Sequence, residues 1–152
     1  MKLLLCFVLA LALGVHSRPH QDRSHHASLG PERECIAEAN VEMSKVMRHV
    51  HTVSDVNDEE VGRYLACVWK KRQMINDNRK VNGENIFRYL KDIYHKENLS
   101  DSNEAEMRDA SKECAKLEDN SEKVLAVKVK NCIIEAVAKM PFLTQPKPRP
   151  SS

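Results

Sequence analysis

The chain has 152 residues, of which 41% are hydrophobic and 30% are charged, and its formal net charge is +2. This length and composition favour one soluble globular domain and argue against a disordered chain. The near-neutral charge predicts no nucleic-acid partner, and only four glycines argue against a turn-rich β sandwich or barrel.

The N-terminus predicts a signal peptide over residues 1–17. Lys2 precedes an apolar run over residues 3–13, which is too short to span a bilayer, and small residues before the predicted cut suit signal peptidase. The alternative is a short membrane anchor. Cleavage after Ser17 removes Cys6 and leaves four cysteines in an oxidising compartment, where disulfides are the default. We therefore expect a secreted, extracellular protein.

Residues 18–30 show no periodic pattern and predict a flexible arm that carries His20, His25 and His26. Histidines can bind copper or zinc, but nothing in this pattern collects ligands in a fixed geometry. A solvated arm is the favoured interpretation, and we predict no metal site.

The first two predicted helices carry the first two mature cysteines. Proline suits a first turn, so one helix begins at Pro31, and its apolar stripe continues to Val50 at three- and four-residue steps. Polar caps at 54–58 begin the next helix, which places Cys67 and the only tryptophan, Trp69, on one turn. An Asn-Asp-Asn run then ends it.

Three further helices follow the same logic. Asn82 or Gly83 caps one, a second covers 104–117, and Ser121 caps the longest and most apolar, which Pro141 ends. The longest helix is apolar on more than one face and is expected to be central. The chain therefore predicts an all-α fold of about six short helices.

The domain boundaries follow from these elements. The helical domain is expected over residues 31–142, and a Pro-rich, extended tail over residues 143–152. The sequon that begins at Asn98 lies in a polar stretch and predicts a glycosylation site.

The four mature cysteines allow three disulfide pairings, and sequence chemistry alone does not choose among them. A zinc site is disfavoured because the chain has no close cysteine pair and no Cys-x-x-His spacing. The cysteines are Cys35, Cys67, Cys114 and Cys132.

The cysteine spacing, the helix order and the signal peptide resemble the insect odorant-binding proteins, which include pheromone and general odorant-binding proteins. That family has six α-helices and usually three interlocked disulfides. Arg63 and Lys123 stand where its second and fifth cysteines would be, so one bonded pair is missing. The chain thus resembles the four-cysteine subgroup often called Minus-C, over residues 32–141.

The resemblance implies the bonds Cys35–Cys67 and Cys114–Cys132. It also implies a shell of helices, braced by these disulfides, around an apolar cavity. The function implied is that of a secreted carrier, which binds small hydrophobic molecules such as odorants, pheromones or related lipophilic ligands reversibly. A membrane chemoreceptor is a further expected partner, and the protein is expected to be a monomer or a weak homodimer.

No catalytic motif argues for an enzyme. The chain has no Gly-x-Ser-x-Gly, His-Glu-x-x-His or phosphate-binding loop, and we predict no cofactor. One alternative is a secreted helical signalling ligand that acts through its outer surface around a filled core. Another is a salivary, reproductive-fluid or haemolymph protein of the same fold.

The residues predicted to line a ligand pocket are apolar residues of the inner helical stripes and the chain end that follows them. They are Val46, Val50, Leu65, Val68, Trp69, Met74, Ile86, Phe87, Leu90, Leu125, Val129, Ile133 and Phe142. For each one the alternative is an ordinary core residue.

Three further expectations concern the wall and the release of a ligand. Flexible methionines would let the wall adapt to several shapes, and Tyr64 or Tyr94 would orient a ligand by a hydrogen bond. Release would respond to pH through a histidine, or to the chain end at Phe142 and Leu143 acting as a lid. The methionines are Met43, Met47, Met74 and Met107, and the histidines are His49, His51 and His95.

Overall fold

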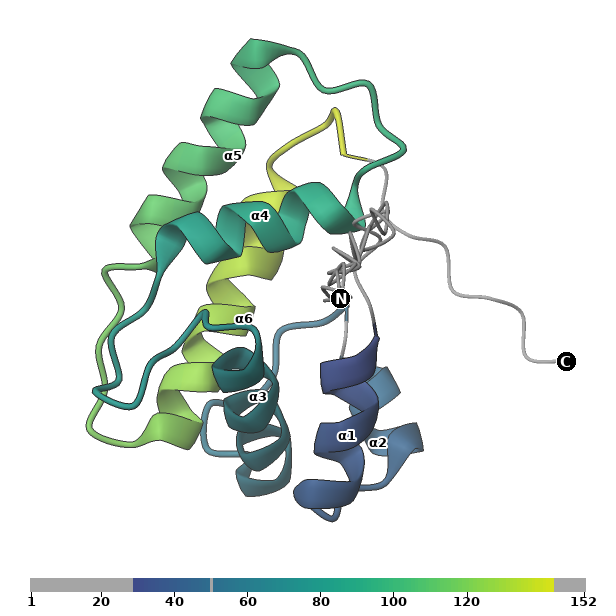
Figure 1. The fold of residues 1–152 in the computed structure, drawn as a ribbon, viewed down its shortest axis with the longest axis vertical. Coiled ribbons are helices and arrows are strands. Elements are labelled where there is room, and N and C mark those ends of the chain that lie inside the picture. The colour runs from purple at the N-terminus through teal and green to yellow at the C-terminus, as the bar shows by residue number, and fades with distance from the viewer. Residues whose placement is uncertain (1–28, 50, 144–152) are drawn as a thin grey trace, which may run out of the picture.

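The computed structural model describes residues 29–49 and 51–143, and in these ranges it contains six α-helices and no strand apart from one isolated bridge (Figure 1). The prediction of an all-α fold is confirmed. The helices are α1 (Gly30–Glu38), α2 (Met43–His49), α3 (Glu59–Lys71), α4 (Gly83–Ile93), α5 (Asp101–Cys114) and α6 (Glu122–Ala138). The predicted signal peptide, the arm up to residue 28, Val50 and the tail from residue 144 lie outside the described residues.

The single helix predicted after Pro31 is wrong, because the structure divides it into α1 and α2. Asn40 has a φ of 48°, a left-handed conformation that asparagine tolerates better than most residues. The Val41 N–H donates to the Ile36 carbonyl at 3.2 Å, and the Asn40 N–H donates to the Ala37 carbonyl at 3.2 Å. This pattern is a Schellman C-cap, which ends α1 and turns the chain into α2.

Polar side chains begin the later helices much as the sequence indicates. The Asp58 carboxylate accepts hydrogen bonds from two N–H groups in the first turn of α3, at 3.1 and 3.0 Å. Asn82 caps α4, and Ser121 caps α6, as predicted. The cap of α5 is Ser100, so this helix begins three residues before the predicted start at 104. Each cap satisfies an N–H group that would otherwise have no partner.

Helix α6 is the centre of the packing, as its apolar sequence predicted. Leu125, Ala126, Val127 and Val129 have no exposed surface. Helix α3 packs along α6, α5 packs on both α4 and α6, and α1 and α2 each pack against α3 (Figure 1). No helix in the described part of the chain has the length and apolar character needed to cross a bilayer.

Two disulfides join neighbouring helices. Cys35–Cys67 ties α1 to α3, and Cys114–Cys132 ties α5 to α6, with a Cα–Cα distance of 5.7 Å in each. This is the pairing that the resemblance implied.

Lys123, one of the two positions where the resembled family would have the missing cysteines, lies at the contact of α3 and α6. Here the helices approach closely because Gly62 has no side chain, and a Cβ at Gly62 would lie 2.9 Å from the Lys123 Cβ. The Lys123 ammonium also forms an ion pair with Glu59 at 2.6 Å. Close packing and an ion pair thus join the two helices at Lys123.

Candidate ligand-binding pocket

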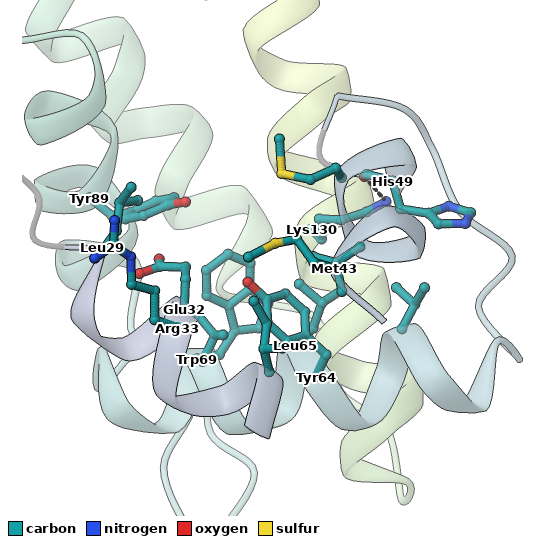
Figure 2. A pocket seen from close by; sticks show the side chains of 15 residues that line it. Leu29, Glu32, Arg33, Met43, His49, Tyr64, Leu65, Trp69, Tyr89 and Lys130 are labelled. Atoms are coloured by element: carbon teal, nitrogen blue, oxygen red, sulfur yellow. Dashed lines mark hydrogen bonds between the residues drawn. The ribbon is translucent and has the colours of Figure 1, made fainter. Parts of the chain in front are cut away.

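A cavity of about 400 Å³ lies between α1, α2 and α3 and is completed by one residue each from α4 and α6 (Figure 2). Most of its wall is apolar. The lining residues are Leu29, Glu32, Arg33, Ile36, Met43, Val46, Met47, His49, Val61, Tyr64, Leu65, Val68, Trp69, Tyr89 and Lys130.

The floor of this cavity is one face of α3. Val61, Leu65 and Val68 recur at helical spacing and are buried, so their side chains point to the same side of the helix. Opposite them, the short helix α2 buries Val46. A helix of seven residues covers little of the apolar face of α3, and the space left between them is the cavity.

The mouth of the cavity carries exposed apolar side chains. Leu29, Met43 and Met47 are 59%, 48% and 58% exposed, although all three line the cavity. Unbranched methionine side chains change conformation at low energetic cost. The mouth can therefore adapt to the shape of an entering molecule.

A second, smaller cavity of about 110 Å³ shares Trp69, Tyr89 and Lys130 with the first. The Trp69 and Tyr89 rings meet edge to face, with their centroids 5.5 Å apart. The Trp69 indole N–H donates to the Ala126 carbonyl at 3.1 Å, which fixes the ring against α6. These rings form much of the wall that the two cavities share.

Glu32, which lines the larger cavity, forms an ion pair with Arg72. The Arg72 guanidinium donates two hydrogen bonds to the Glu32 carboxylate, at 2.7 and 2.8 Å, and it lies 4.9 Å from the centre of the Tyr89 ring. Both charged side chains are largely buried. The bidentate geometry neutralises the one carboxylate that reaches the cavity wall.

Lys130 is the one lysine in the wall, and only 6% of its surface is exposed. Its ammonium donates to the His49 carbonyl at 3.1 Å, to the Thr52 carbonyl at 2.6 Å and to the Ser54 hydroxyl. Burial lowers the pKa of this lysine to about 8. The next residue, Asn131, bonds the Ser54 N–H at 3.0 Å and its carbonyl at 2.8 Å.

Lys130 and Asn131 therefore fasten the segment between α2 and α3 to α6. The sequence gives one signal for this role, because the two polar residues interrupt the most apolar helix. We did not single them out from the sequence.

Burial and the nearby Glu32 carboxylate raise the pKa of both tyrosines in the wall. The pKa of Tyr64 is raised to about 12, and that of Tyr89 is also raised. Both phenols are therefore neutral at physiological pH. A neutral phenol both donates and accepts hydrogen bonds.

The structure thus contains an apolar cavity with a few polar groups in its wall. A comparison of the sequence with known families identifies the family. The sequence model of the PBP/GOBP family matches residues 19–136, which is more than half of the chain.

The chain belongs to the PBP/GOBP family, the insect odorant-binding proteins.

The resemblance inferred from the cysteines is thereby confirmed. This odorant-binding protein belongs to a family of binding proteins, not of enzymes, whose members bind small hydrophobic ligands. No individual curated protein matches the chain.

The structure places six of the thirteen predicted pocket residues in the walls of the two cavities. Val46, Leu65, Val68 and Trp69 line the larger one, and Trp69, Leu90 and Ile133 line the smaller one. The remaining described residues line neither of these cavities, and they belong to the packed core or lie against it. They are Met74, Ile86, Phe87, Leu125, Val129 and Phe142.

The hollow space of this odorant-binding protein is thus displaced from the centre toward α1 and α2. Sequence periodicity marks which face of a helix is buried, but it does not separate a face that meets another helix from a face that meets empty space. Tyr89 and Ile36 line the larger cavity, and the sequence reasoning did not name them as pocket residues.

The polar residues named from the sequence lie at several places. Tyr64 lines the larger cavity and Tyr94 the smaller one. His49 lines the larger cavity and lies 3.0 Å from the Ser54 hydroxyl, and His51 lines the smaller one. His95 and Asn98 are exposed and line neither of them, which leaves Asn98 accessible. Leu143 is buried, at the end of the described chain.

Proposed function

We propose that this protein is a carrier that binds one small apolar molecule reversibly in the larger cavity. The observation that carries the proposal is the cavity itself, which has a volume of about 400 Å³ and an apolar wall around Trp69. Empty apolar space of this size destabilises a folded protein, and an apolar guest removes that penalty. A signalling ligand that acts through its outer surface has no use for such a cavity.

The size of the cavity sets the strength of binding. A guest that transfers about 200–300 Å² of apolar surface from water gains about 5–7 kcal/mol, at about 25 cal/mol per Å². This corresponds to dissociation constants of about 10–200 μM before polar contacts add to the affinity. Such values suit a carrier that loads and releases its cargo.

The ligand contacts that we propose come from four helices, α2, α3, α4 and α6. Val46 of α2 and the α3 residues Leu65, Val68 and Trp69 supply the apolar wall. Leu90 and Ile133 extend it where a longer guest would reach the smaller cavity. The aromatic wall that both cavities share would contact such a guest along its length.

We propose further that the protein is secreted after cleavage of residues 1–17 and belongs to the four-cysteine subgroup. The two disulfides support this, because they form and persist in oxidising compartments. Odorants, pheromones or related lipophilic molecules are the proposed cargo, and a membrane chemoreceptor is the proposed recipient. The proposed state in solution is a monomer or a weak homodimer.

Trp69 provides a direct test because it is the only tryptophan and lines both cavities. Long-chain alcohols and esters are expected to change its fluorescence in a saturable way. Val46→Phe fills the cavity and is expected to abolish this change. The matched control is Val53→Phe, because Val53 is 55% exposed and lines neither cavity. Fluorescence that responds to no apolar compound, or equally in both variants, would contradict the proposal.

A further inference from the structure

Two tyrosine hydroxyls in the wall of the larger cavity have no hydrogen-bond partner among the described residues. Tyr64 from α3 and Tyr89 from α4 both line this cavity (Figure 2), and Tyr64 is only 7% exposed. Neither hydroxyl forms a hydrogen bond with a residue that the structure describes. All fully enclosed polar side-chain atoms of this part of the chain do have partners. The two hydroxyls are therefore not fully enclosed by the described residues.

The buried charged groups around these hydroxyls already have partners in the protein. The three N–H groups of the Lys130 ammonium have three acceptors in the protein, namely the His49 and Thr52 carbonyls and the Ser54 hydroxyl. The Glu32 carboxylate accepts both of its short hydrogen bonds from Arg72. Arg33 lies at the exposed rim, where water screens its charge.

A charged ligand group would therefore find no buried group of opposite charge that is free to bind it in this wall. A carboxylate would meet Glu32 as a like charge, and the buried ammonium has no N–H group left to donate. An ammonium group would find the only nearby carboxylate already paired. A neutral oxygen, in contrast, fits two phenols that are free to donate or accept.

We propose that the Tyr64 and Tyr89 hydroxyls form a head-group site, which binds the hydroxyl or carbonyl oxygen of a neutral apolar ligand and discriminates against the corresponding carboxylate. This inference rests on the proposed carrier function and adds the chemical class of the cargo: alcohols, esters, aldehydes or ketones. The two hydroxyls come from different helices, so the site has one hydrogen-bonding group on α3 and one on α4.

Three probes with the same carbon skeleton test this site in the purified protein: phenylbutanol, phenylbutyrate at neutral pH, and butylbenzene. Titrations that follow Trp69 fluorescence are expected to give the tightest binding for phenylbutanol. Tyr64→Phe and Tyr89→Phe each remove one hydroxyl, and each is expected to weaken the binding of phenylbutanol about two- to tenfold, because a hydrogen bond is lost. The dissociation constant of butylbenzene, which has no oxygen, is expected to change by less than about twofold in these variants.

Tyr94→Phe is the matched control, because Tyr94 is also buried but lines the smaller cavity. It is expected to leave phenylbutanol binding unchanged. The variants at Tyr64 and Tyr89 remove hydroxyls that form no hydrogen bond with the described part of the chain, so both are expected to fold. Butylbenzene that binds as tightly as phenylbutanol, phenylbutyrate that binds tightest, or equal losses for all three probes would overturn the head-group site alone. Binding of none of the probes would contradict the carrier function as well.

Discussion

The two ends of this molecule use the same building unit, a pair of helices joined by a disulfide, for different purposes. At one end, Cys35–Cys67 ties α1 to α3 beside a cavity whose mouth exposes Met47. At the other end, Cys114–Cys132 ties α5 to α6, and Leu125 of α6 has no exposed surface. Helix α3 packs against both α1 and α6 and so belongs to both ends.

The difference shows how a small domain can be hollow and still fold. The packed end supplies buried apolar area, which is the main favourable term in stability. The hollow end buries less apolar area. The disulfide between α1 and α3 compensates because it lowers the conformational entropy of the unfolded chain. Substitutions at the hollow end should therefore mainly affect ligand binding, and substitutions at the packed end should mainly affect the free energy of unfolding.

The largest expected effect is the loss of either disulfide. The bonds span 32 and 18 residues, so the loop-entropy relation gives about 3–4 kcal/mol for each. We expect Cys35→Ala/Cys67→Ala to abolish ligand binding while most helical circular dichroism remains. Cys114→Ala/Cys132→Ala is expected to lose helicity and binding together on warming. Identical behaviour of the two variants would remove the distinction between the ends.

Truncation of one apolar side chain at each end sharpens the comparison. Leu125→Ala leaves a void in close-packed surroundings and is expected to lower the free energy of unfolding by about 2–5 kcal/mol. Val46→Ala removes a side chain that already borders empty space, so a smaller loss of about 1 kcal/mol is expected, together with weaker ligand binding. Urea denaturation measures both values. A loss at Val46 as large as that at Leu125 would show that the α2 end is packed.

The junction between the ends depends on Gly62. Gly62→Ala would place a Cβ 2.9 Å from the Lys123 Cβ, so α3 and α6 must move apart. We expect a loss of about 1–3 kcal/mol in the free energy of unfolding. Lys123→Gly costs about 1 kcal/mol through helix propensity, but it removes the opposing Cβ. The double variant should thus lose less than the sum of the single variants, and strict additivity would contradict the close contact.

A pH dependence is expected where the two ends meet at Lys130. The folded-state pKa is lowered to about 8 from 10.5, so between these values the unfolded chain holds a proton that the folded chain has released. The contribution of Lys130 to the free energy of unfolding therefore rises with pH through this window and is constant below about 8. Lys130→Met is expected to remove that slope. Equal slopes for the variant and the wild type, from denaturation at several pH values, would show that Lys130 is not desolvated.

The sequence predicted the helices well because their signals are local. Polar caps such as Ser121 and the apolar periodicity of α3 depend only on nearby residues. The break between α1 and α2 escaped prediction, since it depends on one asparagine in a left-handed conformation. Nothing in the periodic pattern required Asn40 to adopt it.

The pocket was only partly predictable, for a different reason. Val46 and Leu125 are both apolar residues on buried helix faces, yet one borders a cavity and the other lies in the packed core. The difference depends on how helices far apart in the sequence meet, which hydrophobic pattern does not encode. Tyr89 illustrates the same limit, because its place in the wall depends on how α4 meets α3.

The most direct test of the hollow end is a crystal structure of the protein grown with phenylbutanol. We predict electron density for one molecule between α1, α2 and α3, against Val46 and Trp69, with its oxygen hydrogen-bonded to the Tyr64 or the Tyr89 hydroxyl. Collapse of α2 onto α3, or a ligand bound only outside this cavity, would contradict the account.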